Sequence, residues 1–147
     1  MNTCTCFKLR KLTRTASRFY DAHLARSGMK TTQYSLLRAI GREPTPMAEL
    51  GRRLAIERTT LTRNLKPLAD AGWITIEPGS DARQRIVALT AGGRAAIATA
   101  KQAWRRAQDA LEQALGARSV EALHQQLDRA LLILTPLVER NPDVVNA

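Results

Sequence analysis

The order in which apolar residues change their spacing constrains this fold more than any other feature of the sequence. Two short segments, 46–54 and 58–71, carry apolar side chains three or four positions apart, which is typical of helices. The pattern then changes to that of strands at residues 73–76 and 85–89, and the intervening residues 77–84 are rich in turn formers. Two helices followed by two strands predict a helix-turn-helix with a two-stranded wing.

Helices are predicted on both sides of this segment. Residues 7–25 and 31–41 precede it, while a long helix to Gly116 and another from Ser119 follow it. The apolar stripes of the first and the last two helices cover more surface than one small winged helix can bury. Apolar surface that stays in contact with water costs about 25 cal/mol of free energy per Å². We therefore expect a homodimer in which the N- and C-terminal helices intertwine.

Threonines are predicted to cap three of the helices. Either Thr31 or Thr32 can cap the second helix, and Thr90 can cap the long helix that follows the wing. Thr45 is predicted to cap the first helix of the helix-turn-helix, with Pro46 at the first helical position, where proline is favourable.

The length of 147 residues suits one domain with a real core. The predicted fold is mainly α with a small two-stranded wing. Residues 42–90 form the winged helix-turn-helix DNA-binding region of this single domain, 1–147, and residues 1–41 and 91–147 form the dimerisation helices.

No apolar run is long enough to span a membrane, and basic residues such as Lys8 and Arg10 interrupt any signal peptide. We therefore expect a cytoplasmic protein without a membrane partner.

The net charge of +10 favours polyanions as partners, nucleic acid first. The excess is uneven along the chain. Residues 1–41 hold eight basic residues and one acidic residue, whereas residues 42–90 hold eight and six. The charge therefore concentrates in the first helix and not in the predicted DNA-binding region, so charge alone would indicate the wrong segment.

The second helix of the helix-turn-helix has the composition of a DNA recognition helix. Leu61 and Leu65 are four residues apart and are expected to face inward. The opposite face then carries hydroxyls for phosphates and an arginine that can bind guanine through two hydrogen bonds. A helix presented in this way fits the major groove. The predicted DNA-binding residues of this helix are Arg58, Thr59, Thr60, Thr62, Arg63 and Lys66.

The wing loop adds a second set of predicted DNA contacts. Arg83 lies where a loop tip beside the recognition helix can enter the minor groove, whose potential is strongly negative. Asp81, two residues earlier, is predicted to hold the arginine extended, and Arg85 is the alternative groove contact.

Two cysteines, Cys4 and Cys6, lie near the N-terminus. They cannot form a disulfide framework, and no second pair completes a zinc site. One interpretation is two small thiols without chemistry. The other is a redox sensor or an inter-subunit disulfide, for which nearby cations would stabilise a thiolate.

The sequence contains no catalytic motif, and its only histidines are His23 and His124. We therefore expect that the protein is not an enzyme and that it binds no metal or cofactor.

The sequence resembles the MarR family of bacterial regulators over nearly its whole length. The resemblance rests on residues 47–72, on Trp73-Ile74 and on the spacing Asp81-x-Arg83-x-x-x-Val87-x-Leu89-Thr90-x-x-Gly93. It implies a winged helix with terminal dimerisation helices that binds palindromic double-stranded operators, often as a repressor. It also implies release by small phenolic or aromatic carboxylate ligands, or by cysteine oxidation. Pro67 departs from the family pattern and is expected to bend the recognition helix.

In this family the effector lies between the dimerisation helices and the DNA-binding region. The matching segments offer aromatic walls and a cation for a carboxylate, although each residue also fits an ordinary core or surface position. A rival function remains open, in which the winged helix binds protein instead of DNA and its basic first helix docks an acidic partner. The candidate effector residues are Tyr20, His23, Tyr34, Arg38 and Trp104.

Overall fold

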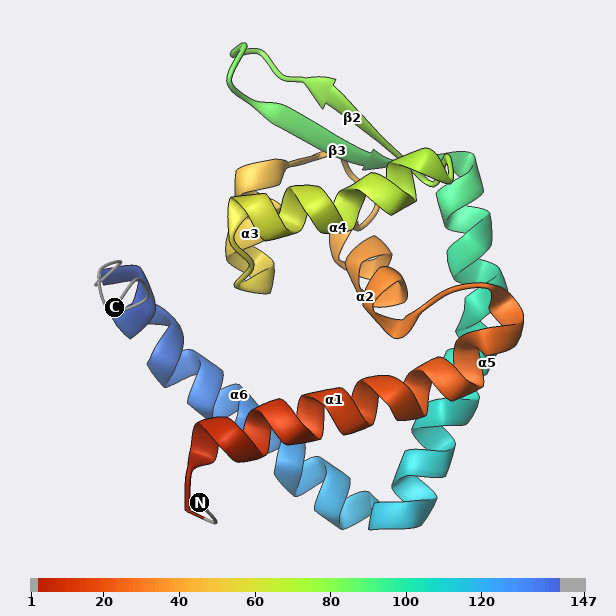
Figure 1. Ribbon diagram of the computed structural model, residues 1–147, viewed down its shortest axis with the longest axis vertical. Helices are drawn as coiled ribbons and strands as arrows, with labels where there is room; N and C mark the ends of the chain where they lie inside the picture. The colour runs from red at the N-terminus through yellow and green to blue at the C-terminus, as the bar shows by residue number, and fades with distance from the viewer. Residues whose placement is uncertain (1–2, 141–147) are drawn as a thin grey trace. The chain divides into compact units, whose positions relative to one another are not determined.

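The computed structural model describes residues 3–140, which form six α-helices, one 3-10 turn and three strands (Figure 1). The six helices and the strands β2 and β3 follow one another in the predicted order, whereas η1 and β1 were not predicted. The elements are α1 (Thr5–Leu24), η1 (Ala25–Ser27), α2 (Thr31–Ile40), β1 (Thr45–Pro46), α3 (Met47–Leu54), α4 (Arg58–Asp70), β2 (Ile74–Pro78), β3 (Arg85–Leu89), α5 (Ala91–Leu115) and α6 (Ala117–Arg140).

The sheet of the wing is antiparallel and has three strands in the order β1-β3-β2. Strands β2 and β3 pair from Ile74 opposite Leu89 to Pro78 opposite Arg85. The prediction of a two-stranded wing was therefore incomplete. Thr45, predicted to cap α3, instead lies in β1 opposite Val87. Its buried hydroxyl donates to the Ile40 and Glu43 carbonyls, so it is not free to cap a helix.

One apolar core lies among α2, α3, α4 and the sheet, and it also includes Leu24 at the end of α1 and Ala100 and Ala103 of α5. Helices α2, α3 and α4 each contribute side chains at three- and four-residue spacing, and β3 contributes the residue that points inward from its middle. The largest side chains with no more than about one per cent of their surface exposed are Leu24, Leu37, Ile40, Leu50, Leu61, Leu65, Leu68 and Val87.

The helix ends follow the sequence at most positions. Gly28, Gly72 and Gly116 adopt positive φ directly after η1, near the end of α4 and after α5, as glycine does at helix C-termini. The predicted threonine cap of α2 was wrong. Lys30 precedes the helix, and the backbone N–H of Thr31 donates to the Asp21 carboxylate of α1 at 2.6 Å.

The chain divides into two compact units, with the division between Ala107 and Gln108 inside α5. The first unit holds the winged helix, residues 42–90, together with α1 and α2. In the second unit α6 begins at Ala117, two residues before the predicted start, and buries only Val120. The prediction that all 147 residues form a single domain stays a prediction.

Candidate nucleic-acid interface

The turn between α3 and α4 brings the two helices into close contact. A Cβ atom on Gly51 would lie 3.0 Å from the Ile56 carbonyl oxygen, so a larger residue at this position would require the turn to shift by a few tenths of an ångström. Ala55 completes the turn in the left-handed conformation, with φ at 51°. The leucines Leu61 and Leu65 of α4 are fully buried against this arrangement. Their burial leaves the opposite face of α4 in solvent.

That solvent face carries every residue predicted to bind DNA from this helix, and all of them are exposed. The Thr62 hydroxyl donates to the Arg58 carbonyl at 2.8 Å, and Lys66 forms an ion pair with Asp70 at 2.8 Å. Among the residues that the structure describes, Arg58 and Arg63 form no ion pair. The exposed set is Arg58, Thr59, Thr60, Thr62, Arg63 and Lys66.

Pro67 lies inside α4 without ending it. The helix continues to Asp70, and the Pro67 carbonyl accepts the N–H of Ala71 at 3.0 Å. Proline removes one backbone donor from a helix, but this one lies in the last turns, beyond the residues predicted to bind DNA. The departure from the family pattern therefore leaves the exposed face at residues 58–66 helical.

The tip of the wing is a tight turn closed by its own residues. The Gly79 N–H donates to the Gln84 carbonyl, and the Gln84 N–H donates to the Asp81 carbonyl, both at 2.9 Å. The Asp81 carboxylate accepts the backbone N–H of Arg83 at 3.0 Å. Asp81 therefore holds the backbone of the turn, and no ion pair joins it to the Arg83 guanidinium in the described part of the chain. Arg83 and Arg85 are both exposed.

Gln84 is a supporting residue of the wing that sequence reasoning missed. Its side chain is half-buried and covers Gly79 so closely that a Cβ atom there would overlap its Oε1 atom. The Ser80 hydroxyl lies 3.4 Å from the same oxygen. The only signal in the sequence was Gly79 itself, which lets the Gln84 side chain lie directly over the backbone.

Comparisons with known proteins agree on one family. The MarR family model matches residues 27–84. The HTH-type transcriptional regulator YwoH of Bacillus subtilis is 36% identical over 66 residues, which are 43% of this chain and 47% of YwoH, so the match spans about half of that curated relative. The M. tuberculosis transcriptional regulator MOSR, solved in complex with DNA, is 36% identical; 86% of this chain and 98% of that chain are covered, with a TM-score of 0.72. This chain belongs to the MarR family.

A further solved structure has the same fold with DNA bound. The transcriptional repressor CouR, bound to a 23-mer DNA duplex, is 25% identical, with 88% of this chain and 93% of that chain covered and a TM-score of 0.78. Membership of the MarR family makes this chain a transcriptional regulator and not an enzyme. No helix in residues 3–140 is long and apolar enough to cross a membrane, and this same stretch holds no cluster of metal-ligating side chains.

The residues that MarR-family resemblance assigns to an effector fall into two aromatic groups. Tyr34 of α2 is buried and stacks on Trp104 of α5, with ring centroids 5.9 Å apart. His23 of α1 packs on Phe19 at 4.7 Å, and its Nδ1 atom lies 2.9 Å from the Phe19 carbonyl. Tyr20 joins this second group by an edge contact with Phe19. Sequence reasoning did not include Phe19, the residue that both other rings contact.

The only cation predicted for that effector site is Arg38. It lies one helical turn after Tyr34 on α2 and is exposed. No acidic side chain is paired with it in the part of the chain that the structure describes. A carboxylate ligand could therefore approach its guanidinium without displacing an ion pair.

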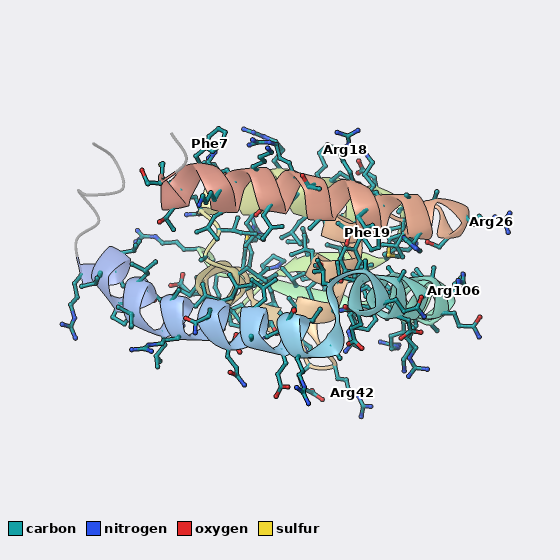
Figure 2. The ribbon with its side chains drawn as sticks, turned by 90° about the horizontal axis from the view of Figure 1, so that it is seen from below. Phe7, Arg18, Phe19, Arg26, Arg42 and Arg106 are labelled. Atoms are coloured by element: carbon teal, nitrogen blue, oxygen red, sulfur yellow. The ribbon has the colours of Figure 1, made fainter. Side chains whose placement is uncertain are left out.

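The first helix carries exposed charges and apolar rings along its length. Figure 2 shows Arg18 and Phe7 on one side of α1 and Phe19 on the other. Lys8, Arg10, Lys11 and Arg14 are exposed along the same helix. Cys4 directly precedes α1 and Cys6 lies in its first turn, and both thiols are free and exposed.

Proposed function

We propose that this protein is a homodimeric regulator that binds a palindromic DNA operator and represses transcription. In the same proposal a small aromatic or phenolic carboxylate releases it from the operator. The protein is located in the cytoplasm, because its operator lies on chromosomal DNA. The observation that carries the proposal is the pairing of an exposed polar face on α4 with an arginine-tipped wing in the same folded unit.

The two elements suit the two grooves of one DNA segment. The first turns of α4 present Arg58, Thr59 and Arg63, which can reach base edges and phosphates in the major groove. The closed turn at the wing tip presents Arg83, whose guanidinium suits the adjacent minor groove. MOSR and CouR have the same fold and were solved with DNA, which supports this assignment. CouR is a repressor, which supports the direction of regulation.

A dimer follows from the apolar residues that the chain leaves in solvent. In α6 the large side chains near its C-terminal end are 50–77% exposed, a condition that costs free energy for each square ångström in contact with water. In α1 Phe7, Leu9 and Leu12 are exposed as well. A two-fold partner presents the same surface in return and can cover it. The residues concerned in α6 are Leu131, Leu132, Ile133, Leu134, Leu137 and Val138.

Selection of binding sites from random duplex DNA at physiological salt tests the DNA-binding proposal. We expect an enriched inverted repeat whose half-sites lie about 10 base pairs apart, centre to centre, because two recognition helices of a dimer enter the groove one turn apart. A variant with Arg63→Ala and Arg83→Ala is the matched control and should enrich no motif. Failure of the wild-type protein to enrich any motif would contradict the proposal.

A salt titration separates DNA binding from the rival function, in which α1 docks an acidic protein. Binding through several phosphates weakens steeply as salt rises, with a slope of about −0.9 per phosphate neutralised. A slope that is smaller by about two phosphates in the variant with Arg63→Ala and Arg83→Ala supports DNA binding by the winged helix. A slope that decreases only when Arg14 and Arg18 are replaced assigns the anion-binding surface to α1.

The effector proposal rests on the stacked rings of Tyr34 and Trp104 and on Arg38, which lies one helical turn after Tyr34 in α2. The half-buried Trp104 supplies apolar ring surface, and the exposed Arg38, which has no ion pair among the described residues, supplies a cation for a carboxylate. A thermal-shift titration with a panel of aromatic acids should raise the melting temperature of the wild-type dimer. The same acids should have less effect on Arg38→Gln, which keeps a polar side chain but removes the charge. No stabilisation by any acid would contradict the effector proposal.

A second candidate signal is oxidation of Cys4 and Cys6. Both thiols are free and exposed, with Lys8 and Arg10 following in the same helix. Mild peroxide should then weaken operator binding reversibly, and Cys4→Ser or Cys6→Ser should remove the response while leaving affinity in reductant unchanged. An operator affinity that peroxide does not alter would eliminate this signal.

A further inference from the structure

The spacing Thr90-x-x-Gly93 is a motif that DNA contact does not explain. Neither residue lies on the exposed face of α4 or at the tip of the wing. Both lie where the end of the recognition helix α4, the start of β2, the end of β3 and the start of α5 meet. We refer to Gly72, Trp73, Thr90 and Gly93 as the joint.

The first half of the joint is the end of α4. The Gly72 N–H donates to the Ala69 carbonyl at 2.9 Å, and the Trp73 N–H donates to the Leu68 carbonyl at 3.0 Å. Gly72 has a φ of +72°, so these two bonds form the pattern that ends many helices at a glycine. The carbonyls of Gly72 and Trp73 remain as acceptors beyond the helix.

Thr90 occupies both of those acceptors at once. Its hydroxyl donates to the Gly72 carbonyl at 2.7 Å, and its backbone N–H donates to the Trp73 carbonyl at 3.0 Å. The same hydroxyl oxygen accepts the N–H of Gly93 at 3.0 Å, which caps α5 as predicted. One side chain therefore bonds the end of α4 and the start of α5 together.

Gly93 allows α5 to approach this close. A Cβ atom on Gly93 would overlap the Trp73 carbonyl oxygen and would lie 3.3 Å from Leu89 Cδ2. The first of these contacts is with backbone, which cannot rotate away as a side chain can. A second bond ties the same turn to the strand, because the Arg94 guanidinium donates to the Leu89 carbonyl at 3.0 Å.

We propose that Thr90 and Gly93 are positioning residues that fix the direction of α5 relative to the recognition helix α4, and thereby the half-site spacing that the dimer accepts. This rests on the proposed function, because only a dimeric DNA-binding protein has a half-site spacing. The role of Thr90 is indirect: it touches the end of α4 and the start of α5, and it acts on DNA only through the orientation of α4.

The geometry of DNA makes spacing a sensitive readout of this orientation. B-form DNA completes a turn in about 10–10.5 base pairs, so one inserted base pair rotates a half-site by about 35° relative to the other. A dimer whose α4 helices are held in one orientation cannot follow that rotation without strain. A dimer with a loosened joint can follow it, and its spacing preference then decreases.

The first test measures the joint without DNA. Spin labels are attached through Asn64→Cys on α4 and Lys101→Cys on α5, both exposed, in a background of Cys4→Ser and Cys6→Ser diluted with unlabelled protein. Thr90→Val keeps the branched shape but removes the hydroxyl, so it should broaden or shift the distance distribution between the labels. Thr90→Ser should restore the wild-type distribution. Thr99→Val is the matched control, because the Thr99 hydroxyl donates to the Ala95 carbonyl within its own helix.

The second test measures operator affinity against spacing. We expect the wild-type protein to bind an operator with its selected spacing about tenfold more tightly than one with an extra base pair. A tenfold difference in affinity corresponds to about 1.4 kcal/mol. Thr90→Val should reduce this preference to about twofold with little change in affinity for a single half-site, and Thr90→Ser should retain it. A wild-type distance distribution and spacing preference in Thr90→Val would overturn the inference. Absence of wild-type operator binding would instead refute the proposed function, and the label distances would still decide whether the joint exists.

Discussion

The winged helix and α6 use their apolar residues in opposite ways. In the winged helix, residues 42–90, four leucines and one valine are completely buried within a single chain. In α6, which is 24 residues long, only Val120 is buried, while Leu132 is 77% exposed. Both segments show helical periodicity in the sequence. Periodicity therefore identifies a helix, but it does not say whether the partner of its apolar face belongs to the same chain.

The largest expected effect would break this comparison by making the apolar face of α6 polar. Leu134→Glu should prevent dimerisation, because a buried leucine is worth about 1.5–3 kcal/mol and two-fold symmetry counts the change twice, giving about 3–6 kcal/mol. Sedimentation velocity on a dilution series measures the dimer dissociation constant. Gln126→Glu adds the same carboxylate elsewhere on the exposed surface of α6 and is the control. A dimer that tolerates Leu134→Glu would show that this face has another role.

A change of similar size is expected inside the winged helix, in the free energy of unfolding instead of the dimer dissociation constant. Leu65→Ala should lower the free energy of unfolding by about 2–5 kcal/mol, since Leu65 is fully buried and the core cannot close the cavity completely. Urea unfolding followed by circular dichroism measures this change. Asn64→Ala, next to it on the exposed side of α4, should stay within about 0.5 kcal/mol of wild type. Equal costs for the two variants would contradict the assigned burial.

A smaller effect is expected on DNA binding alone. Arg83→Ala should weaken operator binding by about 1–3 kcal/mol, as expected for one groove-reading arginine, without lowering the free energy of unfolding. Fluorescence anisotropy with the selected operator measures it. Arg26→Ala removes an equally exposed charge from η1, outside the winged helix, and serves as the control. If both variants lost affinity equally, net charge and not the wing would explain binding.

The smallest effect concerns the Lys66–Asp70 pair at the surface of α4. Both side chains are more than half exposed, so Lys66→Met should change the free energy of unfolding by only about 0.3–0.5 kcal/mol. The same change should reduce the slope of log operator affinity against log salt by about 1, the contribution of one phosphate contact. Calorimetry measures the effect on stability, and a salt titration of operator affinity measures the effect on binding. A large loss of stability with an unchanged salt slope would show that Lys66 acts within the fold.

Sequence reasoning succeeded where the signal was local. Gly72 and Gly116 end their helices with positive φ, and Thr90 caps α5, each through bonds to residues a few positions away. It failed where a partner came from a distant segment. Thr45 was taken for a helix cap because Pro46 follows it, but β3, some forty residues later, pairs with both in a short strand. Asp21 of α1 binds the N–H of Thr31, and no pattern within residues 31–41 could indicate this.

The candidate site was predictable to a similar extent. Burial of Leu61 and Leu65 follows from their spacing, and exposure of Arg58 and Arg63 follows from that burial. The role of Asp81 did not follow, because a carboxylate two residues before an arginine can bind its backbone N–H or its guanidinium. The choice depends on the conformation of the turn, which the covering Gln84 side chain helps to set.

The hydrogen bonds that close the wing tip join residues 79–84 to one another. The conformation of this turn is therefore encoded in a short continuous stretch of sequence and depends little on the core beneath it. A stretch of this kind behaves as a transferable module: grafted onto the strands of another winged helix, it should keep its shape and present Arg83 in the same way. In evolution, substitutions at its outward positions could alter sequence preference without compensating changes in the rest of the protein.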